Sequence, residues 1–562
     1  MGAAPYSFSL EDSVHEKEGS VKLEEGQSPP SSDSDIADES TPTEQPNAHR
    51  YVTGWRLFCL LFGVSLAIFL ANLEVTIVST SLISITNDLN GFSRTGWVVV
   101  AYLITYTGFI IVWAKLSDIL GRKVSINAAL LIFVVTSALC GSAQSMTALI
   151  VFRSLQGIGA AGCFSVSMVI FFEMIPKEKY AKYGSILSAD VALATALGPI
   201  FGGLIVDGTT WRWVFLLNVP GGLLATAILV FLIPSGFPHH WKPKSEQSKA
   251  RIFSMECVER VDFLGSLLLI GANLLLVTAL LEASTTYSWS SGVTIALIVL
   301  SAVLWVLFAG WEWFATKDTV KQEPVFPFRF FFNRAWMGML INSVLLGVPF
   351  TVIVVDLPQR FQAINGVSAL NAGVRLLPYA LFAPLGSLLS NIIFAKKRLP
   401  LTLLLAGATF QFLGLILLAT LPEKPDLPNS LYGFLVIAGL GVGLTFGTLV
   451  VITPESVEPR DLATATGAMI QSRQMGSAIG MTIGSSILNS YLKSNLRHVL
   501  SASQLEALLQ TTAVVKTFPA ELQLPVKQTF AEGYSLQMKV VAGIAAAEFL
   551  AVAMMVKLKH RK

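Results

Sequence analysis

The sequence predicts an all-α polytopic membrane protein, and three observations lead to this fold class. Of the 562 residues, 53% are hydrophobic and 13% are charged, whereas a soluble domain carries about 25% charged residues. The mean hydropathy is +0.63. The apolar residues lie in many separate runs, each near the roughly 20 residues with which a helix spans a bilayer. We therefore expect the chain to cross a lipid bilayer many times.

Fourteen apolar runs are long enough to be spanning helices. We place them at residues 56–82, 96–114, 124–142, 147–173, 184–206, 213–233, 263–282, 292–314, 335–356, 369–394, 400–420, 431–452, 462–490 and 536–557. Because the number of spans is even, both termini lie on the same side of the membrane. The loops rich in lysine and arginine, such as the one holding Lys115, Arg122 and Lys123, are predicted to be cytosolic. Both termini are therefore predicted to be cytosolic.

Composition also divides the chain into domains. Residues 1–50 are rich in Glu, Asp, Ser and Pro, which predicts a disordered cytosolic tail. The remaining boundaries are an N-terminal six-helix bundle at 51–234, a cytosolic linker at 235–262, two inserted helices at 263–314, a C-terminal six-helix bundle at 315–557 with an extracellular loop at 491–535, and a cytosolic tail at 558–562. Two six-helix bundles with an inserted central pair are typical of transporters built from repeats. Fourteen helices without internal symmetry are the alternative.

The fifth span carries Gly198-Pro199, followed by Gly202-Gly203. Proline inside a helix removes a backbone hydrogen bond and bends the helix. Glycines let a neighbouring helix approach closely. We therefore predict a bent and closely packed helix here. A weak echo, Gly476, Gly480 and Gly484, occurs in the thirteenth span and favours internal symmetry.

The first and fourth spans each carry a charge at a depth where charge is costly. Glu74 lies in the outer half of the first span, and Arg153 lies in the outer half of the fourth, before the small residues Gly157 to Gly162. The two side chains could meet. Burial favours the neutral acid while a nearby arginine favours the carboxylate, so their competition makes a proton site. A static structural ion pair is the alternative.

Two further sites follow from charges near the cytosolic side. Asp118, Gly121 and Arg122 lie in the turn between the second and third spans, where Gly121 permits the turn and Asp118 can pair with Arg122 or with a base of the other bundle. This pattern predicts a conformational latch, and a plain basic loop is the alternative. Asp190, in the fifth span, is a second candidate proton site or a structural cap.

Polar side chains inside the later spans are candidates for lining a central cavity. They are Asn342, Tyr379, Gln411, Arg473 and Gln474, with Phe350 beside them. By contrast, Glu173, Glu282, Glu312 and Asp356 lie near span ends, where we expect them to anchor helices at the membrane interface.

Several chemistries have no sequence signal. The chain lacks a phosphate-binding G-x-x-x-x-G-K-[ST] loop, a His and Cys cluster of metal-ligand spacing, and a Ser, His and Asp arrangement in a supporting context. We therefore expect no enzyme activity, no cofactor, no metal site and no nucleic-acid partner.

Together these motifs resemble the major facilitator superfamily, over roughly residues 50–560. Asp118 to Lys123 is similar to that family's loop signature, Arg153 to Gly162 to its fourth-helix motif, and Gly198 to Gly203 to its antiporter motif. Leu73 to Val78 resembles the first-helix motif of the drug:proton antiporters with 14 spans, and the overall pattern is similar to fungal efflux pumps. The resemblance implies proton coupling at Glu74 and Arg153 and a bend and seal at Gly198 and Pro199. Ala114, Ala194 and Glu74 depart from the usual residues, and the loop near Lys396 lacks a second latch motif.

The resulting hypothesis is a proton-coupled antiporter that exports small amphipathic organic molecules such as drugs, toxins or secondary metabolites. Its partners would be the substrate, protons and the lipid bilayer, and it would work as a monomer. We place it in the plasma membrane, with a vacuolar or vesicular membrane as the alternative. A proton-coupled importer of a nutrient or metal chelate and a membrane receptor without transport are the rival hypotheses.

Overall fold

A computed structural model gives the architecture. It describes residues 52–89, 95–176, 179–234, 237, 261–285, 287–316, 322, 324–367, 369–422, 428–458, 461–510, 515 and 518–556. Every element of regular structure in these ranges is a helix, which confirms the all-α fold class. The predicted tails at 1–50 and 558–562, and nearly all of the linker at 235–262, lie outside the described residues.

Seven helices pack together as the first bundle. They are α1 (Trp55–Leu89), α2 (Thr95–Leu120), α3 (Arg122–Ser142), α4 (Met146–Met174), α5 (Tyr180–Gly208), α6 (Arg212–Leu216) and α7 (Asn218–Leu232). The short helices α6 and α7 form a single span that is interrupted at Leu217. The bundle therefore has six spans, packed mainly as α2 on α4, α3 on α4 and α1 on α5.

The second bundle is built from the later helices. They are α12 (Arg334–Asn365), α13 (Ala369–Val374), α14 (Leu377–Lys397), α15 (Pro400–Ala419), α16 (Ser430–Glu455), α17 (Leu462–Leu496), α18 (Ala502–Gln510) and α19 (Ala520–Met555), preceded by the short α11 (Arg329–Phe332). Helices α13 and α14 lie almost end to end within one candidate span, residues 371–397. The strongest packing joins α14 with α16 and α12 with α17.

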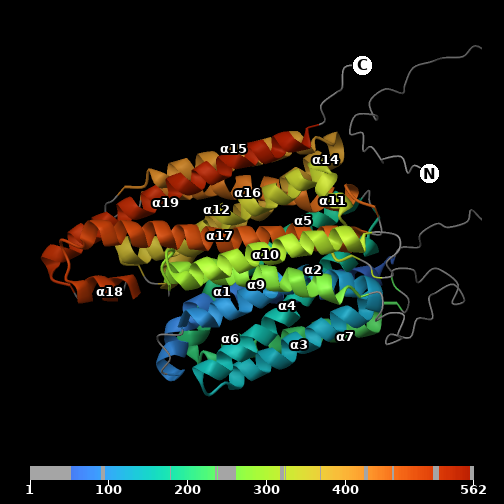
Figure 1. Ribbon diagram of the computed structural model, residues 1–562, viewed down its shortest axis with the longest axis horizontal. Coiled ribbons are helices and arrows are strands. Elements are labelled where there is room, and N and C mark those ends of the chain that lie inside the picture. Colours follow the sequence, from blue (N-terminus) through green and yellow to red (C-terminus); the bar gives the residue numbers. More distant parts are fainter. Residues whose placement is uncertain are drawn as a thin grey trace, which may run out of the picture. The chain divides into compact units, whose positions relative to one another are not determined.

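The two inserted helices, α9 (Phe263–Thr285) and α10 (Gly292–Ala315), lie between the helices of the two bundles in Figure 1. They pack on each other, and α9 also contacts α2 of the first bundle and α17 of the second. Val277 of α9 belongs to a buried apolar cluster with Ile104 of α2 and Ala478 of α17. The hydroxyl of Thr482 donates a hydrogen bond of 2.8 Å to the carbonyl of Leu280. The inserted pair therefore covers one side of the interface between the bundles.

Thirteen helices in the described part of the chain are long and apolar enough to cross a membrane. The one predicted span missing from these thirteen, at 462–490, corresponds to α17, which has 35 residues but fewer large apolar side chains. Its glycines and alanines are buried against α12, α2 and α19, so it presents little surface to lipid. A helix that is surrounded by other helices needs less hydrophobic surface than one that faces lipid.

The fifth helices of the two bundles repeat the same contact. In the first bundle, α5 packs on α1, and in the second, α17 packs on α12. Gly476 and Gly480 of α17 lie directly against the backbone of α12, at Val344 and Val348 respectively. The glycines of both fifth spans thus lie in corresponding places, and the structure favours internal repeats over fourteen unrelated helices.

The segment predicted as an extracellular loop, residues 491–535, is largely helical instead. Helix α17 continues to Leu496, α18 follows, and α19 begins at Ala520 rather than near residue 536. A compact apolar cluster that includes Leu496, Leu508 and Phe530 holds these parts together. The loop prediction failed because these helix ends bury their apolar residues against one another rather than against lipid.

Candidate functional site

The structure brings Glu74 of α1 and Arg153 of α4 into a buried ion pair. The Nη1 atom of Arg153 lies 2.5 Å from Oε1 of Glu74. The two side chains are 0% and 1% exposed respectively, so the pair is fully enclosed by protein. The other carboxylate oxygen of Glu74 accepts a hydrogen bond from Nδ2 of Asn218, the first residue of α7. One carboxylate therefore connects the first, fourth and sixth spans.

Arg153 makes further contacts that hold its guanidinium in place. Its Nε donates to the carbonyl of Val98 at 3.0 Å, and its Nη1 also donates to Oε1 of Gln156 at 2.7 Å. The ring of Tyr102 lies 4.3 Å from the guanidinium carbon. Buried charges are tolerated when they are both paired and hydrogen-bonded. These contacts anchor the guanidinium to α2 and α4 as well as to α1.

Small residues in α4 allow this close approach. A Cβ atom on Gly159 would lie 2.6 Å from the backbone nitrogen of Phe133 in α3. A Cβ on Gly162 would lie 2.8 Å from the ring of Trp113 in α2. Real Cβ atoms do not approach neighbours so closely, so larger residues would push the helices apart. The glycine run after Arg153 therefore packs α4 tightly against α2 and α3, as predicted.

The glycine of the predicted antiporter motif packs against α1, the helix that carries Glu74. A Cβ on Gly198 of α5 would lie 2.8 Å from the Cβ of Thr76 and 3.0 Å from the backbone nitrogen of Ile77. Thr76 follows Glu74 by two residues on α1. The close contact between α1 and α5 therefore occurs within one helical turn of the buried carboxylate.

The other residues of this motif differ from one another. Gly202 is buried, and the side chain of Pro199 lies outside the described residues, so the bend there stays a prediction. The close packing predicted for Gly203 is wrong, because a Cβ at that position would meet no atom of the described residues within 4 Å. Glycine spacing alone does not show which side of a helix faces a neighbour.

Asp190 lies elsewhere on α5 and does not join the Glu74 pair. It is half-buried, and its Oδ2 atom has no hydrogen-bond partner among the described residues. The next residue, Val191, lines a pocket between α5 and the second bundle. Asp190 is thus close to that pocket and separate from the ion pair.

The predicted latch is an ion-pair cluster within the first bundle. Gly121 has a φ of 89°, which permits the tight turn between α2 and α3. Arg122 lies 2.6 Å from Asp118 and 2.6 Å from Glu173, which is near the end of α4. Glu173 is therefore a partner of Arg122, and the membrane anchoring predicted for it is wrong.

The contact with the second bundle beside this cluster is apolar. Ala114 of α2, Val169 of α4 and Ala463 of α17 are buried together, and a Cβ on Gly467 would lie 3.1 Å from that of Ala114. Among the residues that the structure describes, the acid of the latch pairs with its own bundle. Small side chains, rather than a charge pair, join the two bundles here.

The second bundle has a related pair that sequence reasoning missed. Arg398, which follows α14, lies 3.2 Å from Glu455 at the end of α16. Arg122 and Glu173 occupy the corresponding places between the second and third spans and at the end of the fourth. Because Arg398 lacks the Asp-x-x-Gly pattern before it, only the pairing of a loop arginine with a glutamate at a helix end could have revealed it.

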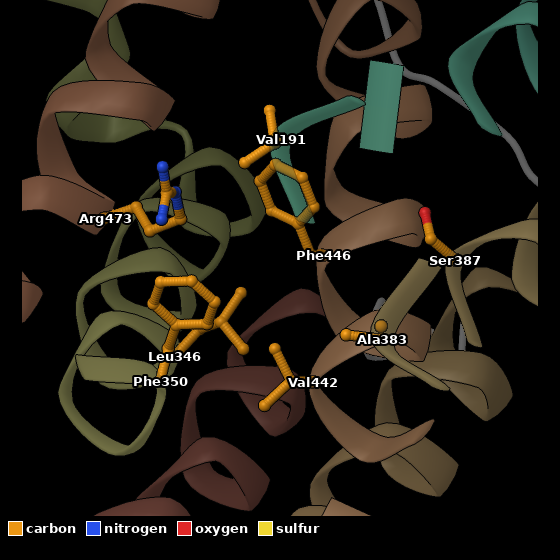
Figure 2. Close-up of a pocket in the computed structure, with 9 residues that line it drawn as sticks. Val191, Leu346, Phe350, Ala383, Ser387, Val442, Phe446 and Arg473 are labelled. Carbon is orange, nitrogen blue, oxygen red and sulfur yellow. The ribbon is translucent and has the colours of Figure 1, made fainter. Parts of the chain in front are cut away.

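A pocket lies between α5 and the second bundle (Figure 2). It contains about 400 Å³ of space that is free of protein atoms, and this volume includes open solvent. Its lining residues are Val191, Leu346, Phe350, Ala383, Ser387, Val442, Gly443, Phe446 and Arg473. The pocket therefore combines residues of both bundles, and most of its wall is apolar.

Arg473 and Phe350 are the cavity candidates that line this pocket. Asn342, Tyr379, Gln411 and Gln474 are buried but do not line it. Gln411 of α15 instead donates a hydrogen bond to the buried carboxylate of Glu548 in α19. The prediction that Gln411 faces this cavity is therefore wrong, because its side chain faces the neighbouring helix of its own bundle.

Three further acids predicted as interface anchors are buried. Glu312 is fully buried and Glu282 is 4% exposed. Asp356 of α12 is 7% exposed and accepts a hydrogen bond from Gln537 of α19. Position along a span did not reveal that these side chains face other helices. No group of three His, Cys, Asp or Glu side chains in the described ranges could hold a metal ion.

The comparisons with known proteins agree with this architecture. A sequence profile described as Major Facilitator Superfamily matches residues 64–481. The chain is 39% identical over 513 residues to the MFS-type transporter FPY5 of Fusarium mangiferae, covering 91% of this chain and 85% of that protein. It is 28% identical to the MFS-type efflux pump LUC4 of a Fusarium species, covering 90% and 88%.

The fold also matches a solved structure. A bacterial homologue of the human lysosomal transporter Spinster, in an inward-facing and unoccupied conformation, superimposes with a TM-score of 0.56 at 17% identity, covering 90% of this chain and 98% of that one. The sequence profile spans most of the helical region, and the FPY5 relative aligns along nearly the whole chain. This protein therefore belongs to the Major Facilitator Superfamily and is a multi-pass membrane transporter rather than an enzyme.

Proposed function

We propose that this transporter is a proton-coupled antiporter that exports small amphipathic organic molecules. The observation that carries the proposal is that α1 holds both the buried carboxylate of Glu74, which pairs with Arg153, and the residues Thr76 and Ile77 against which Gly198 of α5 packs. A change in the charge of Glu74 thus acts directly on the helix that packs against α5. Since Val191 of α5 also lines the pocket, one helix connects the proton site with the pocket.

Proton binding to Glu74 would remove the charge that attracts Arg153. The arginine would keep its hydrogen bonds to Val98 and Gln156 and would therefore stay in place, while its attraction to α1 would weaken. Helix α1 could then shift relative to α4, and α5, which packs against α1, would move with it. Proton loss on the cytosolic side would restore the pair and reset the transporter. The two bundles would rock about the pocket and expose it to each side in turn.

The proton gradient supplies enough free energy for export. One proton that moves down ~100 mV releases about 2.3 kcal/mol. One pH unit adds about 1.4 kcal/mol. Together they support a substrate gradient of roughly 500-fold per proton, because each 1.4 kcal/mol is a factor of ten.

The direction of transport is supported by similarity to a protein named as an efflux pump and by the antiporter-like glycine motif at Gly198. We place the transporter in the plasma membrane as a monomer. Both termini would lie in the cytosol, because the loops rich in lysine and arginine are expected on that side.

Inside-out membrane vesicles test this function. The full chain is expressed in yeast, and vesicles are loaded with an acidic interior. Addition of a transported compound should dissipate the pH gradient, read with a pH-sensitive dye, and the compound should accumulate inside the vesicles. Vesicles that carry the Glu74→Gln variant are the control for leakage.

The rival functions give different results in the same vesicles. A proton-coupled importer would release preloaded compound from them, with protons and compound leaving together. A receptor would bind compound without any flux. Either result would refute export.

A further inference from the structure

Arg473 of α17 is a buried cation, and no carboxylate in the described part of the chain pairs with it. Its side chain is 5% exposed and lines the pocket between the bundles. The guanidinium carbon lies 5.3 Å from the ring centre of Phe446 and 5.6 Å from that of Phe350. Within the described ranges, no hydrogen-bond acceptor or carboxylate contacts this guanidinium, so the two rings are its main partners.

The other buried arginines of the described chain have acceptors. Arg122 has two carboxylates, Arg153 has Glu74, and Arg360 donates to the carbonyl of Pro422. A buried charge without a partner costs several kcal/mol, and a cation over an aromatic face recovers about 0.5–2 kcal/mol. An anion bound at the wall of the pocket would therefore stabilise the buried charge of Arg473.

The described surroundings of Arg473 supply no such anion. Among the described residues that line the pocket, Ser387 is the other one with a polar side chain. Asp190 precedes the lining residue Val191 but makes no ion pair with Arg473 in the described structure. The remaining wall is formed by valine, leucine, alanine and phenylalanine side chains.

Figure 2 shows how these groups are arranged. Arg473 and Phe350 lie on the left of the view, Ser387 and Ala383 lie on the right, and Phe446 lies between them. The apolar wall favours an apolar body in this pocket, and an acidic group on that body would lie against the guanidinium. The hydroxyl of Ser387, which lines the pocket and has no hydrogen-bond partner in the described structure, would donate to the same molecule.

We propose that the transported substrate is an amphipathic organic anion, whose carboxylate, sulfonate or enolate group binds Arg473 while its apolar body packs on Phe350 and Phe446. This substrate class rests on the export function proposed above. An arginine binds such groups through two parallel, charge-assisted hydrogen bonds, which also fix the orientation of the ligand.

An anionic substrate changes the charge that moves in each cycle. Export of one anion in exchange for one proton moves two positive charges inward, whereas a neutral substrate moves one. An inside-negative potential therefore drives anion export with about twice the free energy, near 4.6 kcal/mol per ~100 mV. Transport of the anion should respond more steeply to membrane potential than transport of a neutral analogue.

Three probes with one ring system test the charge preference: naphthalenesulfonate, neutral naphthalenesulfonamide and cationic naphthyltrimethylammonium. Binding to the purified full chain in detergent is measured by titration calorimetry. We expect the sulfonate to bind at least ~10-fold more tightly than the sulfonamide, as one charge-assisted contact provides. Arg473→Gln should raise the Kd of the sulfonate by ~10-fold or more and leave that of the sulfonamide within about twofold.

Two variants serve as controls. Arg473→Lys keeps the charge without the planar fork and should retain part of the preference. Arg375→Gln removes an arginine that donates to Tyr432 outside the pocket and should leave all three Kd values unchanged. Size-exclusion elution and thermal unfolding of each variant show that the fold is kept.

Any of three results would overturn the inference. Equal binding of sulfonate and sulfonamide, or preference for the cationic probe, would refute it, and so would an unchanged sulfonate Kd in Arg473→Gln. These measurements involve no proton gradient. If binding prefers the sulfonate but acid-loaded vesicles show no coupled flux, then the export function fails while the substrate class stands.

Discussion

The Glu74→Gln substitution gives the most direct test of the coupling mechanism. The new amide keeps one oxygen for Arg153, but its nitrogen faces the amide nitrogen of Asn218, which now donates to Glu74. One buried donor thus loses its acceptor unless Asn218 rotates. An unsatisfied buried polar group costs about 1–3 kcal/mol, and an uncompensated buried charge costs about 3–5 kcal/mol. Since Arg153 keeps Val98 and Gln156, we expect a loss of unfolding free energy of about 3 kcal/mol.

The functional effect should be much larger than the effect on stability. Without a titratable group, the cycle has no proton to exchange at this site, and the accumulation that the pH gradient drives, about tenfold per pH unit for one proton, should fall to about one. Accumulation in acid-loaded inside-out vesicles measures this change, and thermal unfolding of the purified chain measures the stability. Naphthalenesulfonate binding at Arg473 should be retained.

Two matched variants make the result specific. Asp88→Asn changes an acid of the same helix whose side chain is 52% exposed and pairs with Arg212, and it should transport normally. Glu74→Asp keeps an acid and should retain coupling at a reduced rate. If Glu74→Gln accumulates substrate as the wild-type chain does, the assignment of Glu74 as the proton site is wrong.

Three other predictions follow from the packing. Gly198→Val should abolish coupling before it lowers expression, because its Cβ would overlap Thr76. Gly203→Val should transport normally, because its Cβ meets no described atom. Vesicle accumulation and surface expression distinguish these outcomes. Arg122→Gln should destabilise the described conformation by about 3–5 kcal/mol, since Asp118 and Glu173 lose their cation. The distribution of spin-label distances between the bundles should then broaden, and an unchanged distribution would contradict a latch. Gln411→Leu should lower the melting temperature by leaving Glu548 without its amide donor but leave probe binding unchanged, and altered binding would return Gln411 to the cavity wall.

The sequence correctly predicted the features that depend on a buried charge, on a flexible glycine or on hydrophobic length. The meeting of Glu74 and Arg153 followed from matching depths in two spans, because each buried charge needs a partner and few were available. The turn at Gly121 followed from its flexible backbone. The all-α class followed from composition, since only helices satisfy every backbone group within a long apolar run.

The errors concern the direction in which side chains face. Gly203, Gln411, Glu312 and Asp356 lie in spans that were placed correctly, yet their surroundings were misjudged. A helix that is apolar all round gives no sign of which side faces lipid and which faces protein. Helix packing selects that side, and packing depends on contacts between residues far apart in the chain.

The sequence by itself determined that this chain is a helical membrane transporter with a charged pair in its first bundle and a glycine-rich fifth helix. Those features are local, because hydrophobic length, glycine and isolated charge each act within a few turns of one helix. Only the tertiary structure decided that Gly198 contacts Thr76 and Ile77 of α1, and that Arg473 lines the pocket with no carboxylate paired to it among the described residues. Both depend on which helices become neighbours. Whether a buried arginine has an acidic partner is decided by the side chains that all the surrounding helices direct toward it.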